Sequence, residues 1–179
     1  MSQRSLQARD AVGAADGITV RLATVEDVPA LVALINDAYR RSERGLFGQT
    51  RTSVEMVHAA LDNTETSVFV AMTNGQLAGS VEMHLTRESA HYGTLATAIG
   101  MHGRGVASRL IAYVERRGSE AGHSEMRIEC VREVGLKAYY EARGYELTHT
   151  VEEPLDSERS IAWQATRPWA MLHMRKLLR

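Results

Sequence analysis

A strand pattern in the middle of the chain ends in glycines and passes directly into a helix pattern. Residues 92–99, YGTLATAI, are typical of a strand, and the turn after them contains Gly103 and Gly105. From residue 104 onward, apolar side chains recur at the spacing of one helix face, and charged side chains occupy the opposite face. Because a helix with one apolar face must bury it, this unit predicts a helix packed on a sheet.

Two further strand patterns lie upstream and flank a strong turn signal. Residues 68–72 and 77–85 are rich in apolar residues, and the dipeptide Asn74-Gly75 lies between them. Asparagine followed by glycine favours the positive φ angles of a type I′ turn. We therefore expect an antiparallel hairpin here.

Similar patterns predict the rest of the domain. The segments that begin at Thr24 and Thr52 each carry an acidic residue three positions later, which is typical of a capping box at a helix start. Because antiparallel strands precede a β-α-β unit, the predicted fold class is α/β in the mixed α+β sense, with helices on the faces of a mixed sheet. We expect further strands at residues 18–23, 126–131, 145–151 and 168–176, and helices at residues 24–39, 52–61, 104–121 and 136–142.

The composition favours a single globular domain. The chain has 179 residues, of which 44% are hydrophobic, and this is enough for one core. We expect a loose polar tail at residues 1–17 and one domain at residues 18–179. The net charge of -1 argues against a nucleic-acid partner, and the lack of a long apolar run argues against a signal peptide or a membrane span. Cys130 is the only cysteine and lies in a predicted buried strand, which favours a reducing, cytoplasmic location.

The glycine turn has the features of a phosphate site. Backbone N–H groups at a helix start have no partner within the helix, and the helix dipole adds positive potential there. A nucleoside triphosphate loop needs a lysine, but none lies between Gln76 and Lys137. A dinucleotide fingerprint needs a third glycine where Ser108 stands. These residues alone do not decide which cofactor carries the phosphate that would bind here. They also leave open a purely structural role for the turn.

Two motifs together resemble the GNAT acyltransferase superfamily. The run at residues 95–110, LATAIGMHGRGVASRL, is similar to the acetyl-CoA signature Arg/Gln-x-x-Gly-x-Gly/Ala, with Gly105 and Ala107 at the two small positions. The later block at residues 137–145, KAYYEARGY, resembles the tyrosine-containing motif of the family, with Tyr140 at the tyrosine. The first predicted strand and helix also resemble those of the family, so the likeness covers nearly the whole predicted domain.

The resemblance implies a GNAT-type sheet, mainly antiparallel, of about six to seven strands flanked by about four helices, with a V-shaped gap between the fourth and fifth strands. Acetyl-CoA would be the co-substrate, with its pantetheine arm along the fourth strand and its pyrophosphate at the glycine turn. His102 stands where the family has Arg or Gln, so a shorter side chain faces that contact. The implied cofactor-binding residues are Leu95, Ala96, Thr97, His102, Gly103, Arg104, Gly105, Val106, Ala107 and Ser108.

The resemblance also implies an N-acetyltransferase in which an amine attacks the thioester directly in a ternary complex. Tyr140 is expected to be the acid that protonates the departing thiolate. Glu82 and His84 share the polar face of one predicted strand, so both are candidates for the general base, and His91 is a weaker alternative. No group of residues has a convincing metal-ligand pattern, so we predict no metal.

The acceptor is expected to be a primary amine of a small molecule or a peptide, and the resemblance is compatible with a homodimer. Glu43 and Arg51 follow the first helix and either hold a charged acceptor or are simply solvated. Trp163, Trp169 and Met171 either belong to the core or, as the resemblance implies, shape the acceptor pocket or dimer contacts. The alternative function is a non-catalytic module that binds acyl-CoA as a sensor.

Overall fold

One seven-stranded sheet organises the computed structural model, which describes residues 17–179. The predicted tail therefore lies, except for its last residue, outside the described residues. The strands are β1 (Ile18–Leu22), β2 (Thr66–Thr73), β3 (Gln76–Leu85), β4 (Ala90–Thr97), β5 (Glu125–Val131), β6 (Glu146–Glu153) and β7 (Trp169–Leu177). The helices are α1 (Val28–Ser42), α2 (Val54–Asp62), α3 (Val106–Glu120), α4 (Lys137–Glu141) and α5 (Glu158–Ala162), with short 3-10 turns at Val25–Asp27 and Arg132–Val134.

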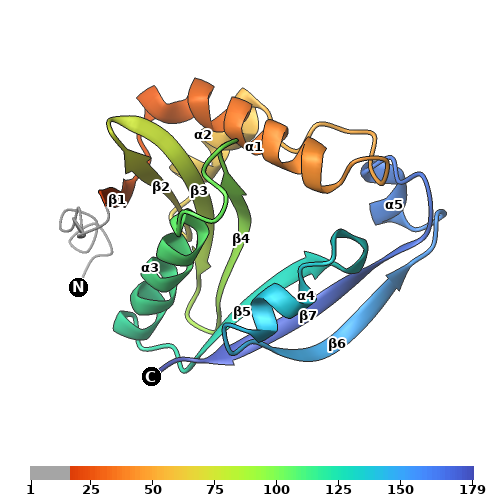
Figure 1. The fold of residues 1–179 in the computed structure, drawn as a ribbon. Coiled ribbons are helices and arrows are strands. Elements are labelled where there is room, and N and C mark those ends of the chain that lie inside the picture. The colour runs from red at the N-terminus through yellow and green to blue at the C-terminus, as the bar shows by residue number, and fades with distance from the viewer. Residues whose placement is uncertain (1–16) are drawn as a thin grey trace.

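The sheet is mixed and opens at its centre. Its strand order is β1-β2-β3-β4-β5-β7-β6, and every neighbouring pair is antiparallel except β4 with β5. These two parallel strands pair only at His91 with Arg127 and at Tyr92 with Ile128, after which they run apart (Figure 1). The expected fold class, with its gap between the fourth and fifth strands, is confirmed.

The helices cover both faces of the N-terminal part of the sheet (Figure 1). On one face, Leu110 and Val114 of α3 are fully buried in a core that also contains Tyr140 of α4. On the other face, Leu31 of α1 and Val57 of α2 form a second core with β2 and β4. Among the described residues, no helix is both long and apolar enough to cross a membrane.

Gly79 on β3 lets α3 approach the sheet closely at the point where the helix begins. A Cβ atom at this position would lie 2.7 Å from Cγ1 of Val106 and 2.8 Å from the carbonyl oxygen of Ala96. Neither distance is tolerated, and the second involves backbone that cannot move away easily. Gly79 therefore determines how near the start of α3 lies to β4.

The structure differs from the sequence expectations at two local elements. The N-cap of α2 is Ser53, whose hydroxyl accepts a hydrogen bond from the Met56 N–H, so the expected cap at Thr52 was wrong by one residue. The segment between β6 and β7, expected to be only a loop, contains α5. This helix has five residues and is too short to show helical periodicity in the sequence.

The short helix α5 closes one end of the open sheet by meeting the loop after α1 (Figure 1). Phe47 in that loop pairs with Ala165 just after α5, and the Thr166 hydroxyl donates to the carbonyl oxygen of Gly45 at 2.8 Å. Leu46 is buried beside Trp169 of β7 in a third, smaller core. These contacts fix the loop relative to β7.

Candidate active site

A cleft of about 1430 Å³ lies where β4 and β5 separate. We call its two parts the cofactor side and the acceptor side. The cofactor side is lined by residues 94–97 of β4, the glycine turn and α4, and the acceptor side by the end of α1, the loop after it, and Trp163. Tyr140 and His84 both line the cleft, so the predicted acid and one predicted base face the same space.

The β4 strand has an irregular, unpaired edge on the cofactor side. Ser80 of β3 pairs with Ala96 and Glu82 pairs with Gly93, so one residue of β3 lies opposite two residues of β4. Within this bulge Thr94 has a φ of 46°, which is unfavourable for a β-branched residue. The bulge bends β4 away from β5, and the backbone of residues 93–97 has no β5 partner.

The glycine turn presents backbone amides at the end of this edge. Gly105 is the N-cap of α3 and has a φ of 83°, which a residue with a side chain rarely adopts. The Arg109 N–H bonds to the Gly105 carbonyl oxygen at 2.9 Å. The amides of residues 106–108 precede that bond and have no acceptor within the helix. His102 is exposed beside them.

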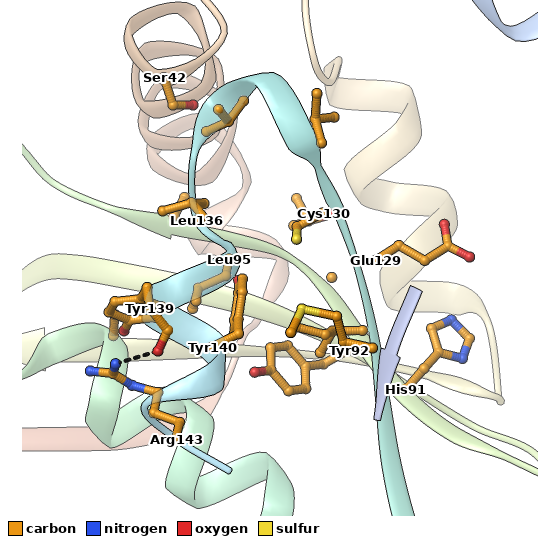
Figure 2. Close-up of a pocket in the computed structure, with 18 of the residues that line it drawn as sticks. Ser42, His91, Tyr92, Leu95, Glu129, Cys130, Leu136, Tyr139, Tyr140 and Arg143 are labelled. Carbon is orange, nitrogen blue, oxygen red and sulfur yellow. Dashed lines mark hydrogen bonds between the residues drawn. The ribbon is translucent and has the colours of Figure 1, made fainter. Parts of the chain in front are cut away.

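Arg143 stands next to this turn, and sequence reasoning missed it. Its Nη2 donates to Oγ of Ser108 at 2.9 Å. Its Nη1 donates to the Tyr139 carbonyl oxygen at 2.8 Å, as Figure 2 shows. The guanidinium carbon lies 3.5 Å from the centre of the Tyr139 ring. The only signal in the sequence is its place within the KAYYEARGY block, because residues 108 and 143 meet only through the fold.

Tyr140 points from α4 towards β5 and Cys130 (Figure 2). It is 6% exposed. Burial raises its pKa well above the usual value, and the hydroxyl of Tyr39 raises it further. Burial also raises the pKa of the Cys130 thiol to about 11. Both groups are therefore protonated at neutral pH, as a proton donor must be.

Glu82 and His84 form a hydrogen-bonded pair on β3. His84 Nε2 lies 2.8 Å from Glu82 Oε1, and His84 Nδ1 lies 3.0 Å from Oγ1 of Thr66. A carboxylate only accepts, so with a neutral imidazole Nε2 carries the proton and Nδ1 accepts from the Thr66 hydroxyl. Both imidazole nitrogens are thus occupied. Glu82 does not line the cleft itself. It lines a separate cavity of about 20 Å³ together with Ser80, whose buried hydroxyl has no partner, and Thr94, which also lines the cleft.

His91 lies beside this pair, on the neighbouring strand. Its ring stacks on His84 with centroids 4.5 Å apart and an angle of 14° between the planes. Burial lowers the pKa of His91, and the neighbouring His84 lowers it further. In Figure 2, His91 lies on the same side of β5 as Glu129, whereas Cys130 lies on the side of Tyr140.

The residues expected to shape the acceptor site divide into two groups. Glu43, Arg51, Trp163 and Met171 line the cleft. Trp169 does not, because it is 0% exposed and its Nε1–H donates to Oγ of Ser160 at 2.9 Å inside the core. Trp169 is therefore a core residue, which was the alternative to a role in the pocket. Within residues 17–179 no cluster of three His, Cys, Asp or Glu side chains has a metal-binding arrangement.

A family model for the acetyltransferase (GNAT) domain matches residues 35–155, about two thirds of the chain and all of the elements around the cleft except β7 and α5. The chain belongs to the GNAT acetyltransferase family. It is accordingly an acyltransferase of the N-acetyltransferase class. No curated protein sequence matches this GNAT chain significantly.

Solved structures share its fold. A ribosomal-protein-alanine N-acetyltransferase from Brucella melitensis is 24% identical, with a TM-score of 0.68, over 89% of this chain and 99% of that one. The ribosomal-protein-S18-alanine N-acetyltransferase from Escherichia coli is 14% identical, with a TM-score of 0.68, over 90% and 94%. The PaiA N-acetyltransferase from Thermoplasma acidophilum, solved with coenzyme A, is 16% identical, with a TM-score of 0.70, over 89% and 98%.

Proposed function

We propose that this GNAT protein transfers the acetyl group of acetyl-CoA to a primary amine of a small molecule or peptide, by direct attack in a ternary complex. The observation that carries the proposal is the separation of β4 and β5 after Tyr92 and Ile128. It leaves an unpaired strand edge that ends at the free amides of α3 and lies in one cleft with Tyr140.

The cofactor side fits coenzyme A. The unpaired backbone of residues 93–97 matches the alternating amides of a pantetheine arm, and the amides of residues 106–108 suit a pyrophosphate at a helix start. Arg143 adds a fixed positive charge beside Ser108. Because Ser108 accepts from Arg143, its own hydroxyl proton is free to donate to a phosphate oxygen. Arg143 thus supplies charge that the shorter His102 does not bring to the turn.

Acetyl-CoA supplies an activated thioester, and Tyr140 supplies the proton for its sulfur. Tyr140 lines the cleft between β4 and β5, where the pantetheine arm would end. The hydroxyl is protonated at neutral pH, so it can donate its proton to a thiolate that forms beside it, although its raised pKa makes it a weaker acid than a free tyrosine. Tyr140 is therefore the proposed acid.

Glu82 is the proposed base, and His84 is the residue that positions it. Both nitrogens of His84 are engaged, by Glu82 and by Thr66, whereas the Glu82 carboxylate has a second oxygen available. The cavity of about 20 Å³ beside Glu82 is large enough for one water molecule. Thr94 lines both this cavity and the cleft, so we propose that a water molecule there relays the proton of the attacking ammonium to Glu82. The amine loses its proton to Glu82 before attack.

The solved structures support the class of reaction. Two of them are named as N-acetyltransferases acting on the alanine of a ribosomal protein, so an amino group of a peptide or amino acid is a reasonable acceptor class for this chain. The structure with coenzyme A supports the cofactor.

The test is release of free thiol from acetyl-CoA in the presence of a panel of primary amines, with wild-type protein and two variants. Tyr140→Phe should lower kcat by at least about 10-fold while the affinity for coenzyme A changes little. Tyr139→Phe is the matched control, because its buried hydroxyl has no partner and it lies on the same helix.

Two outcomes would contradict the proposal. If coenzyme A binds but no amine is acetylated, the chain is the non-catalytic acyl-CoA module. If Tyr140→Phe abolishes coenzyme A binding and leaves kcat unchanged, Tyr140 holds the cofactor and is not the acid.

A further inference from the structure

Arg51 presents a guanidinium group to the acceptor side of the cleft between two aromatic rings. Its Cζ atom lies 4.5 Å from the centre of the Tyr39 ring and 4.9 Å from that of Trp163. Stacking covers the faces of the guanidinium but leaves most of its N–H edge unused. Among the described residues, no carboxylate lies within 4.0 Å of Arg51.

The backbone around Arg51 is anchored, so the guanidinium is held in place before any ligand arrives. The side-chain amide of Asn36 donates to the Thr52 carbonyl oxygen at 2.9 Å and accepts from the Thr52 N–H at 2.9 Å. On the far side of Arg51, Trp163 packs edge-on against Phe47, with ring centres 5.2 Å apart. Helix α1, the loop after it and the end of α5 thus meet at this one side chain.

The charges around Arg51 suit a ligand with a single negative charge. Arg41, the other arginine at this end of α1 that lines the cleft, is already paired with Asp37 at 2.8 Å. Glu43 is half-buried in the same wall, and burial raises its pKa although the charge of Arg51 lowers it. A single guanidinium that has no carboxylate within 4.0 Å, with the Glu43 carboxyl group in the same wall, favours a planar carboxylate ligand over a phosphate dianion.

This position lies in the same cleft as the groups proposed for catalysis. Arg51 and Tyr39 line that cleft together with Tyr140 and with His84, which contacts Glu82. A carboxylate on Arg51, which stacks on the Tyr39 ring, would therefore share one cleft with an amine placed near Tyr140.

Resting on the proposed function, we propose that Arg51 determines acceptor specificity by binding a carboxylate next to the reactive amine, so that the acceptor is a free amino acid. The guanidinium forms a two-pronged hydrogen-bonded pair with the carboxylate and thereby orients the amine towards the thioester. Trp163 and Tyr39 keep the guanidinium in the required plane.

The experiment compares free amino acids with their carboxamides as acceptors. Rates are expressed per unprotonated amine, because the two amines differ in pKa. Wild-type protein should prefer the acid by roughly 10- to 100-fold in kcat/KM, the range expected for a hydrogen-bonded ion pair. Arg51→Gln should bring this ratio to about 1 by raising KM for the acid, with little change for the carboxamide. The ratio is internal to each variant, so a partly unfolded sample does not alter it.

Arg44→Gln is the matched control, because Arg44 is an exposed arginine of the same loop. It should keep the wild-type preference. Calorimetry on protein saturated with coenzyme A measures binding of the same acids and carboxamides without turnover. Binding of an acid that depends on Arg51, without acetylation of any amine, would support the carboxylate site while contradicting the proposed function. Three outcomes would overturn the inference. The wild-type protein could use acids and carboxamides equally well, or Arg51→Gln and Arg44→Gln could have equal effects. Alternatively, peptides whose first residues are uncharged could be acetylated as well as the free amino acids.

Discussion

Nε2 of His84 lies 2.8 Å from Oε1 of Glu82, two residues earlier on the same strand. This contact directs the free carboxylate oxygen of Glu82 and ties the side chain to Thr66 through the imidazole. The contact therefore distinguishes the role of Glu82 from that of His84. Their position on the same face of the strand does not distinguish them.

Glu82→Gln should lower kcat by about 100-fold, because an amide cannot accept the ammonium proton. His84→Gln should lower kcat less, because it removes the contact that orients Glu82 without removing the carboxylate. Rates measured against pH check both variants. Glu55→Gln, on the exposed side of α2, is the control. An unchanged profile in Glu82→Gln would eliminate it as the base.

Gly105→Ala should raise KM for acetyl-CoA several-fold and lower the free energy of unfolding by about 1 kcal/mol, because its φ of 83° is unfavourable for alanine. Gly122→Ala is the control, since it has a φ of 90° with equally open surroundings at the opposite end of α3. The control should show the stability loss alone. Equal KM values in the two variants would argue against the glycine turn as the pyrophosphate site.

Gly79→Ala should destabilise the protein by about 1–3 kcal/mol, because the new methyl group would overlap Val106 and the Ala96 carbonyl oxygen. Denaturant unfolding measures the loss. Gly93→Ala should cost less, since no atom lies within 4 Å of the place its methyl group would take and its φ is not positive. Similar losses of unfolding free energy in both variants would show that α3 can move away from β3 at little cost in free energy.

Asp27→Asn should lower the free energy of unfolding by about 1–3 kcal/mol at pH 7. Hydrogen bonds from Arg21, at 2.6 and 2.8 Å, lower the pKa of Asp27 from 3.8 to about 2. A lowered folded-state pKa stabilises the protein above the unfolded-state value, and this contribution is lost as the pH falls from about 4 towards 2. The gap between wild type and Asp27→Asn should close over that interval. The exposed Asp62→Asn should show no such gap.

Local patterns in the sequence predicted most of the fold. The Asn74-Gly75 turn, the amphipathic face of α3 and the glycines before it all depend on residues within one or two turns of each other, so neighbouring residues carry the information. The predicted first and last residues of the strands were less accurate. Helix α5 was missed because five residues are too few to show helical periodicity. The order of the elements and the match to the family then indicated the gap between β4 and β5.

The sequence by itself determined which segments form strands and helices, and it named Tyr140, Glu82 and His84 as candidates. Only the tertiary structure decided their relations: Tyr140 lies on the same side of β5 as Cys130, Arg143 reaches Ser108, and Arg51 is held between Tyr39 and Trp163. In the last two sets, each arginine is 12 to 112 positions along the chain from the residues that it contacts. Their proximity arises from the packing of α4 and α5 onto the open sheet. A pattern of neighbouring residues in the sequence does not predict such long-range contacts.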